Sequence, residues 1–394
     1  MSDKLGRKDT LVYIFLPHAL GWLVICYAES VPVLLFGRFL NGFALGVMVC
    51  VIPIYCVEIA TVEVRGILGS AFQGFSNIGN VLSVIIGAYV PWNYLALNGA
   101  VCTILAIILF CPMPETPRWL LMKNKLPEAI KVMHDLQGGF VNAEKECKAI
   151  YQDLQNQPKG RVTWEELKRP SSYKPALICL FLMFFHQFTG IDAVLLYSSS
   201  IFEVSKDFIN PKLATIILAV VQLIITLFSN AIIDKAGRKI LLTLSGSLMA
   251  VSFAIFGFYY YKLSLDYSFE DSYGWIPLVS CITAIIGYSI GFGPIPYLLS
   301  AELAPVRVRS TLSGIVMFSN GLFSFILLRT FSGLEHLLKN YGAFWFYSFL
   351  CVLGIIYVLL CVPETKGKTS EEIQDIFDNR RNKRVEHINI GVIS

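Results

Sequence analysis

Ten stretches of the sequence are each about as long and as apolar as a membrane-spanning helix. A helix that crosses the hydrocarbon core of a bilayer needs roughly 20 mostly apolar residues. The stretches lie near residues 11–29, 32–56, 67–91, 94–112, 175–202, 211–233, 239–261, 275–300, 310–330 and 341–362. Only 15% of the residues are charged, whereas a soluble domain carries about 25%. The sequence therefore predicts an all-α membrane protein with about ten spans.

Basic residues are distributed unevenly around these stretches. If the long polar segment 113–174 lies inside, 26 of the 32 lysines and arginines fall in inside loops and the tail. Only Lys206, Lys212, Lys262 and Lys339 then fall in outside loops. Because cytoplasmic loops carry the excess of basic residues, the pattern places both termini in the cytoplasm. Helical spacing of apolar residues within 113–174 predicts short amphipathic helices there.

The sequence carries no motif that indicates nucleic-acid binding, metal binding or catalysis. The net charge of +4 requires no nucleic-acid partner. The ten cysteines form no CxxC pair and no Cys/His spacing typical of a metal site. No GxxxxGK[ST] phosphate-binding loop and no Ser/His/Asp arrangement in a pocket-like context is present. We therefore expect neither an enzyme nor a bound cofactor, and we expect a small-molecule ligand and the lipid bilayer as partners.

Three short charged motifs each occur twice, in the same order. They are Asp-x-x-Gly-Arg-Lys at 3–8 and 234–239, a Glu seven positions before an Arg at Glu58/Arg65 and Glu302/Arg309, and Pro-Glu-Thr at 114–116 and 363–365. Parallel repeats of this kind are typical of major facilitator transporters.

The repeated motifs suggest a charge network at the cytoplasmic side. Glycine permits a tight turn between two helices, and the acids and arginines can pair or cap helix ends. We expect a network that latches the helices in one state; the plainer alternative is a topology signal with solvated charges. Arg38, inside an apolar stretch, is expected to pair with backbone carbonyls or an acid. The candidate residues are Asp3, Arg7, Arg38, Glu58, Arg65, Asp234, Gly237, Arg238, Glu302 and Arg309.

Longer signatures surround these motifs. They are GRFLNG at 37–42, PIYCVEIATVEVRG at 53–66, PETPRWLL at 114–121, HQFTGIDAVLLYSSSIF at 186–202, DKAGRK at 234–239, GFGPIPYLLSAEL at 291–303 and PETKGKT at 363–369. With them the chain resembles the sugar porters of the major facilitator superfamily, over nearly all of residues 3–377. Among animal members it is most similar to the intracellular-type glucose facilitators and the insect facilitated trehalose transporters. The resemblance implies facilitative transport of a hexose or trehalose by alternating access, most naturally at the plasma membrane.

The first repeated motif lies unusually early for that family. In sugar porters, which have two bundles of six helices, it follows the second helix, whereas here it begins at residue 3. We therefore expect the first two helices to be absent. The expected division is a four-helix remainder of the N-terminal bundle (1–112), a cytoplasmic loop (113–174), a six-helix C-terminal bundle (175–362) and a cytoplasmic tail (363–394). Two alternatives stay open: a proton-coupled sugar or polyol symporter, and a non-transporting truncated isoform that acts through a full-length partner.

Lone amides inside apolar helices are the candidate sugar contacts. An amide both donates and accepts hydrogen bonds, as a sugar hydroxyl does, and charges are costly in the membrane. Each amide could instead make an interhelical hydrogen bond. The positions, which also match sugar-contacting sites of the family by resemblance, are Gln73, Gln187, Gln222 and Asn320, with Tyr197 as the aromatic gate.

The candidate site departs from the family pattern at three positions. His186 replaces the first Gln of the pair, Asp192 replaces an Asn, and Tyr297 replaces the Trp of GPIPW. We hypothesise that His186 and Asp192 alter substrate choice or add pH sensitivity; the alternative is an Asp hydrogen-bonded to water. Pro294 and Pro296 are expected to bend their helix and act as a hinge.

Overall fold

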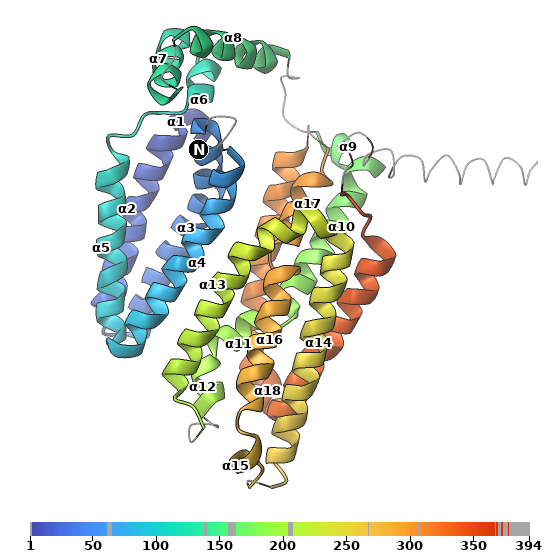
Figure 1. Cartoon of the computed structure of the whole chain (residues 1–394). Coiled ribbons are helices and arrows are strands. Elements are labelled where there is room, and N and C mark those ends of the chain that lie inside the picture. Colours follow the sequence, from blue (N-terminus) through green and yellow to red (C-terminus); the bar gives the residue numbers. More distant parts are fainter. Residues whose placement is uncertain are drawn as a thin grey trace, which may run out of the picture. The chain divides into compact units, whose positions relative to one another are not determined.

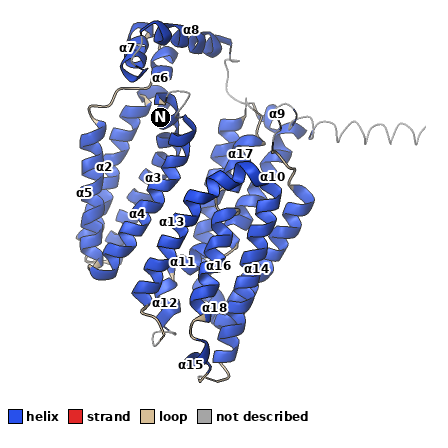
Figure 2. Cartoon of the chain, viewed as in Figure 1, coloured by secondary structure: helices blue, strands red, loops and turns tan. Residues whose placement is uncertain are grey.

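A computed structural model describes residues 2–60, 65–137, 140–156, 163–203, 208–266, 268–305 and 308–366, together with positions 368, 372 and 377. Helices are the only regular secondary structure in these residues, as Figure 2 shows. This agrees with the predicted all-α fold. The chain divides into two compact units, Met1–Gly160 and Arg161–Ser394.

The first unit contains four long helices and a group of short ones (Figure 1). The helices are α1 (Ser2–Leu5), α2 (Arg7–Cys26), α3 (Val31–Ile59), α4 (Arg65–Tyr89), α5 (Trp92–Phe110), α6 (Pro117–Met122), α7 (Leu126–Gln137) and α8 (Phe140–Asn156). Helix α2 packs against both α3 and α5, where Leu11, Ile14 and Met48 are buried. Helices α6 to α8 share a separate small core, which includes Leu121 and Cys147. The predicted amphipathic helices of the long polar segment are therefore present.

The second unit is a larger helical bundle. Its helices are α9 (Trp164–Leu167), α10 (Pro170–Phe188), α11 (Ile191–Leu196), α12 (Ser198–Glu203), α13 (Pro211–Ala236), α14 (Arg238–Leu263), α15 (Phe269–Tyr273), α16 (Ile276–Ile290), α17 (Ile295–Glu302) and α18 (Arg309–Cys361). Helix α14 packs against α16 and α18, and α10 packs against α18. Two large apolar cores fill the bundle, and a small third cluster includes Val308 and Leu312.

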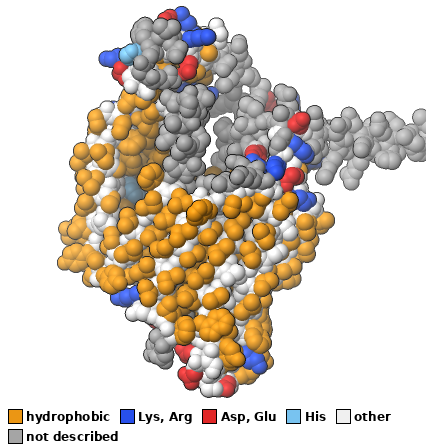
Figure 3. All heavy atoms as spheres, viewed as in Figure 1, with side chains coloured by type: hydrophobic (Ala, Val, Ile, Leu, Met, Phe, Trp, Pro, Cys, Tyr) orange, Lys and Arg blue, Asp and Glu red, His pale blue; other side chains and the backbone are white. Residues whose placement is uncertain are grey.

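Each of the ten predicted apolar stretches is mostly helical. Eight helical segments of the described residues are long and apolar enough to cross a membrane: Arg7–Cys26, Val31–Ile59, Trp92–Phe110, Pro170–Leu196, Pro211–Ser229, Arg238–Leu263, Ile276–Ser300 and Thr311–Cys361. Helix α4 contributes a shorter apolar part, Gly74–Tyr89. The last segment contains two of the predicted stretches, divided at Lys339, whose φ of 58° is not helical. On α14 the side chains of Ile240, Val251 and Phe258 are exposed, and hydrophobic side chains cover the face of the second unit in Figure 3.

Two of the spans in the second unit are interrupted helices. The first breaks between α10 and α11, where Gly190 has φ of +81°. A β-carbon on Gly190 would lie 2.6 Å from Cγ of Tyr347, so the site requires glycine for both its backbone angle and its space. The second span breaks between α16 and α17. There Pro294 and Pro296 lie at the start of α17 instead of bending a continuous helix. Breaks in membrane helices occur where backbone or side chains line a site.

Candidate functional site

A chain of buried and half-buried polar side chains lies at the two helix breaks of the second unit. His186 Nδ1 lies 2.6 Å from the carbonyl oxygen of Phe292. His186 Nε2 lies 3.2 Å from the hydroxyl of Tyr288 and 3.3 Å from the hydroxyl of Tyr297. Asn320 Nδ2 donates to the Tyr297 hydroxyl at 3.0 Å. The side chains of these residues therefore connect α10, α16, α17 and α18, while Phe292 takes part only through its backbone carbonyl.

The chain continues to the amide of Gln187. Gln187 Nε2 donates to Asn320 Oδ1 at 2.8 Å. The side chain of Gln187 is 3% exposed, and its Oε1 has no hydrogen-bond partner in the described part of the protein. A buried acceptor without a partner costs about 1–3 kcal/mol. The structure thus brings together four predicted site residues, namely His186, Gln187, Tyr297 and Asn320, and leaves one acceptor available.

Asp192 lies near this chain without an ion pair to His186. It occupies the first turn of α11. Its carboxylate is close enough to interact electrostatically with His186, Tyr288 and Tyr297. The predicted His186–Asp192 pair therefore stays a prediction.

Tyr197 and Gln222 lie elsewhere in the second unit. The ring of Tyr197, at the junction of α11 and α12, stacks on Phe331 with centroids 4.7 Å apart. Gln222 lies on α13, and its side-chain Oε1 is buried with no hydrogen-bond partner among the described residues. Among the described residues, neither side chain makes a hydrogen bond or a ring contact with the His186 chain.

The charged motifs of the second unit converge on two carboxylates. Arg238 pairs with Glu302 at 2.9 Å, and the two side chains are 12% and 23% exposed. Thr365 Oγ1 donates to the other carboxylate oxygen of Glu302 at 2.6 Å. Glu364 accepts the backbone N–H groups of Arg238 at 3.1 Å and Lys239 at 3.0 Å, at the start of α14. Three repeated motifs thus meet at one end of the bundle.

The first unit repeats this arrangement. Arg7 pairs with Glu58 at 3.1 Å and with Asp3 at 3.2 Å. Glu115 accepts the backbone N–H groups of Arg7 at 2.9 Å and Lys8 at 3.1 Å, at the start of α2. In both units a positive-φ glycine, Gly6 or Gly237, precedes the helix, and a β-carbon on it would crowd the capping carboxylate.

The remaining predicted network residues are not part of these clusters. Arg38 on α3 is exposed and has no ion-pair partner among the described residues. The side chains of Arg65, Gln73, Asp234 and Arg309 lie outside the described part of the structure. Their predicted roles stay predictions.

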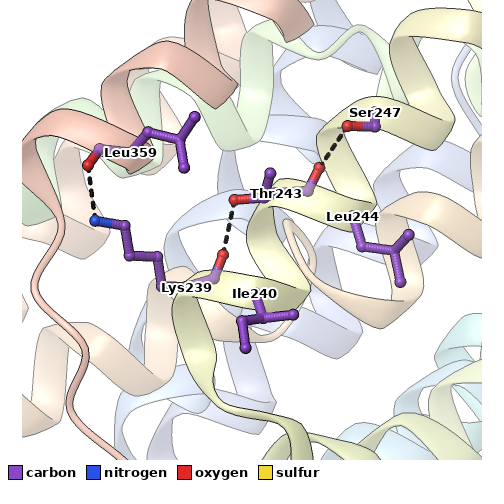
Figure 4. Close-up of a pocket in the computed structure, with 6 residues that line it drawn as sticks. All are labelled: Lys239, Ile240, Thr243, Leu244, Ser247 and Leu359. Carbon is purple, nitrogen blue, oxygen red and sulfur yellow. Dashed lines mark hydrogen bonds between the residues drawn. The ribbon is translucent and has the colours of Figure 1, made fainter.

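One pocket of about 530 Å³ lies between α14 and the end of α18 (Figure 4). Lys239 Nζ reaches across it to the carbonyl oxygen of Leu359 at 2.7 Å. The hydroxyls of Thr243 and Ser247 each donate to their own helix backbone, so they are not available to a ligand as donors. None of the predicted sugar contacts lines this pocket.

Sequence reasoning missed several members of these clusters. Tyr288 and Phe292 were not singled out, although Phe292 lies inside a recognised signature. Glu115 and Glu364 were noted as members of a repeat, but their capping contacts lie 108 and 126 residues away along the chain. The in-register repetition of the motifs was the signal that could have joined them.

Comparisons with known proteins agree with the fold and the motifs. The family model "Sugar (and other) transporter" matches residues 1–377. A facilitated trehalose transporter, Tret1, of Apis mellifera ligustica is 39% identical over 380 residues, covering 95% of this chain and 75% of that protein. The facilitated glucose transporter member 8 of Bos taurus is 38% identical over 399 residues, covering 96% of this chain and 81% of that protein.

A solved structure has the same fold. The inward-open xylose transporter XylE from E. coli superposes with a TM-score of 0.78 at 24% identity, covering 95% of this chain and 84% of that one. These relatives are transporters, in agreement with the expectation that the chain is not an enzyme. On the family model, the two relatives and the shared fold, the chain belongs to the sugar transporter family of the major facilitator superfamily.

Proposed function

We propose that this protein carries a sugar, a hexose or trehalose, across a membrane down its concentration gradient. The observation that carries the proposal is the Gln187–Asn320 amide pair in an apolar bundle, with Gln187 buried and its Oε1 unsatisfied among the described residues. Uncharged amides match sugar hydroxyls in both donating and accepting. The printed names of the relatives, facilitated trehalose and facilitated glucose transporters, support a facilitative mode for this chain.

Alternating access is the mechanism that we propose. Two spans of the second unit are interrupted beside the amide pair, at Gly190 and at Gly291 to Pro294, and we propose these breaks as the points that move during transport. The ion pairs Arg7–Glu58 and Arg238–Glu302 would hold helices together in one state and separate in the other. Tyr197, Gln222 and Gln73 are proposed as further sugar contacts, and Pro294 and Pro296 as the hinge.

The proposed membrane placement follows the distribution of basic residues. We propose that both termini and the helices α6 to α8 lie in the cytoplasm, and that the plasma membrane is the site of action. The proposed division is a four-helix bundle over 1–112, a cytoplasmic segment over 113–174, a six-helix bundle over 175–362 and a cytoplasmic tail over 363–394.

Uptake of labelled glucose and trehalose by yeast without hexose transporters tests the function. We expect saturable uptake by the chain, and a loss of about tenfold or more in the Gln187→Ala variant because the amide contact disappears. The matched control is Gln152→Ala, which removes an exposed amide from α8. Membrane-located protein with no uptake of either sugar would contradict the proposal and support the non-transporting alternative.

A proton-coupled symporter is the second candidate, favoured by Asp192 beside His186. Because an intramembrane acid is a common proton carrier, coupled uptake would depend on pH and acidify the side that receives sugar. Uptake that is unchanged between about pH 5 and 8, in both the wild type and Asp192→Asn, would exclude this candidate.

A further inference from the structure

The tautomer of His186 determines which atoms of the neighbouring side chains donate. A carbonyl oxygen only accepts, so the 2.6 Å contact with Phe292 requires the hydrogen on Nδ1. In the neutral ring Nε2 then carries a lone pair and accepts. Two hydroxyls lie within reach of this lone pair, Tyr288 at 3.2 Å and Tyr297 at 3.3 Å. Since the Tyr297 oxygen accepts from Asn320 Nδ2, the Tyr297 hydrogen is directed at His186. The carbonyl of Phe292, in the break between α16 and α17, thus determines that His186 Nε2 is an acceptor.

The same direction passes on to the two amides. Because the Tyr297 hydrogen is directed at His186, the Tyr297 oxygen is left to accept from Asn320 Nδ2 at 3.0 Å. Asn320 then turns Oδ1 toward Gln187, which donates Nε2 to it at 2.8 Å. Gln187 is left with Oε1 as its available atom, and that atom is buried without a partner in the described residues.

The opposite direction would give a different site. If the Tyr297 hydroxyl donated to Asn320, the Asn320 amide would turn over and donate to Gln187. Gln187 would then present its NH₂ group, and the sugar atom that it binds would have to be a hydrogen-bond acceptor. The amide hydrogen bonds of the structure follow the first arrangement, and the acceptor at His186 Nε2 is what the Tyr297 hydrogen requires for it.

We infer that His186 is a positioning residue for substrate selection: through Tyr297 and Asn320 it makes Gln187 present a carbonyl oxygen, so that one sugar hydroxyl must donate. The inference rests on the proposed sugar transport and adds its selectivity. A sugar with fluorine in place of that hydroxyl keeps an acceptor but has no donor. It is therefore expected to be rejected at one ring position and tolerated at the others.

Competitive uptake with a panel of singly fluorinated deoxyglucoses tests the inference on the unmodified chain. We expect one ring position at which the fluoro sugar is at least about tenfold weaker than the hydroxyl sugar, since a site built around a hydrogen bond rejects an analogue without it. If every fluoro sugar competes within about twofold of glucose, the inference is wrong, whatever the variants do.

Variants then test the route through His186. Tyr297→Phe and His186→Gln each remove the enforced direction, so the discrimination at that ring position should fall to near equality. Tyr288→Phe is the matched control: it removes the other hydroxyl on His186 Nε2, at 3.2 Å, but leaves the connection to Asn320 intact. The discrimination should survive in this variant.

The outcomes separate this inference from the proposed function. Discrimination that persists in Tyr297→Phe and His186→Gln overturns the inference while sugar transport stands. A wild-type chain that reaches the membrane but neither transports nor binds any sugar overturns the proposed function, and the inference with it. Should the variants not fold, the fluoro-sugar panel on the wild type still decides, because a strict donor requirement at one position is its direct consequence.

Discussion

Glu364 accepts the backbone N–H of Arg238 at 3.1 Å, at the first residue of α14. The same carboxylate accepts the N–H groups of Lys239, Thr365 and Lys366, each at 3.0 Å. The first four N–H groups of a helix have no partner within it, and a negative charge there is favourable. Glu364 therefore stabilises the start of α14 from a segment more than a hundred residues away in sequence.

Removal of this cap should destabilise the protein. We expect Glu364→Ala to lower the free energy of unfolding by about 1–2 kcal/mol, because two helix N–H groups lose their acceptor. Thermal unfolding of the purified protein in detergent measures the change. Glu128→Ala is the control: its ion pair with Lys125 is exposed at the surface and contributes about 0–1 kcal/mol. Equal effects of the two substitutions would contradict the capping role.

The cap should also depend on pH. Burial alone would raise the pKa of Glu364, but the N–H groups of Lys366, Lys239, Arg238 and Thr365 together hold that pKa below its ordinary value of 4.5. A lowered pKa in the folded state gives stability that is present above pH 4.5 and is lost as the pH falls through the folded pKa. The difference in melting temperature between the wild type and Glu364→Gln should thus be constant above pH 4.5 and shrink below it. A difference that grows on acidification would contradict this assignment.

Arg238 and Glu302 should act on transport as one unit. Their 2.9 Å ion pair is mostly buried, and Thr365 holds the second oxygen of Glu302. If the pair latches one state of the cycle, Arg238→Ala and Glu302→Ala should each lower uptake several-fold by changing the balance of states. The double variant should lose less than the product of the single losses, since contacting residues are not additive. Uptake per surface-expressed protein is the measurement, and full additivity would show that the two side chains act separately.

The helices themselves were predictable from the sequence, because the bilayer imposes length and apolarity on each span. Each of the ten apolar stretches is mostly helical, and the short helices of 113–174 were anticipated from their spacing. The break at Gly190 was not, because a single glycine inside an apolar run is compatible with a continuous helix. The need for glycine at this position becomes clear only in the fold, where the ring of Tyr347, far along the chain, packs against it.

The candidate site was predictable in its residues and not in its connections. Lone amides and a histidine in apolar helices stand out because burial of polar groups is costly. Tyr288 did not stand out, since tyrosine is common in such helices, and only the fold brings it to 3.2 Å from His186. The helix caps were not predicted for a related reason. A helix cap normally comes from the residue next to the helix, whereas here the capping carboxylates of Glu115 and Glu364 come from distant segments.

Gly190→Ala should damage the second unit more than a helix-interior substitution of the same kind. The added β-carbon would lie 2.6 Å from the Tyr347 ring, at a backbone angle of +81° that side chains disfavour, so we expect a loss of about 1–3 kcal/mol in the free energy of unfolding. Gly321→Ala on α18 is the matched control, because nothing lies within 4 Å of the added atom and alanine favours the helix by up to about 1 kcal/mol. Thermal unfolding in detergent should therefore show opposite signs for the two variants. A double-mutant cycle with Tyr347→Ala separates the two causes. Tyr347 is fully buried, so its own removal is costly, but it takes away the clash and leaves the backbone strain. Gly190→Ala should therefore cost less stability on the Tyr347→Ala background than in the wild type, whereas an equal cost would assign the whole loss to the backbone.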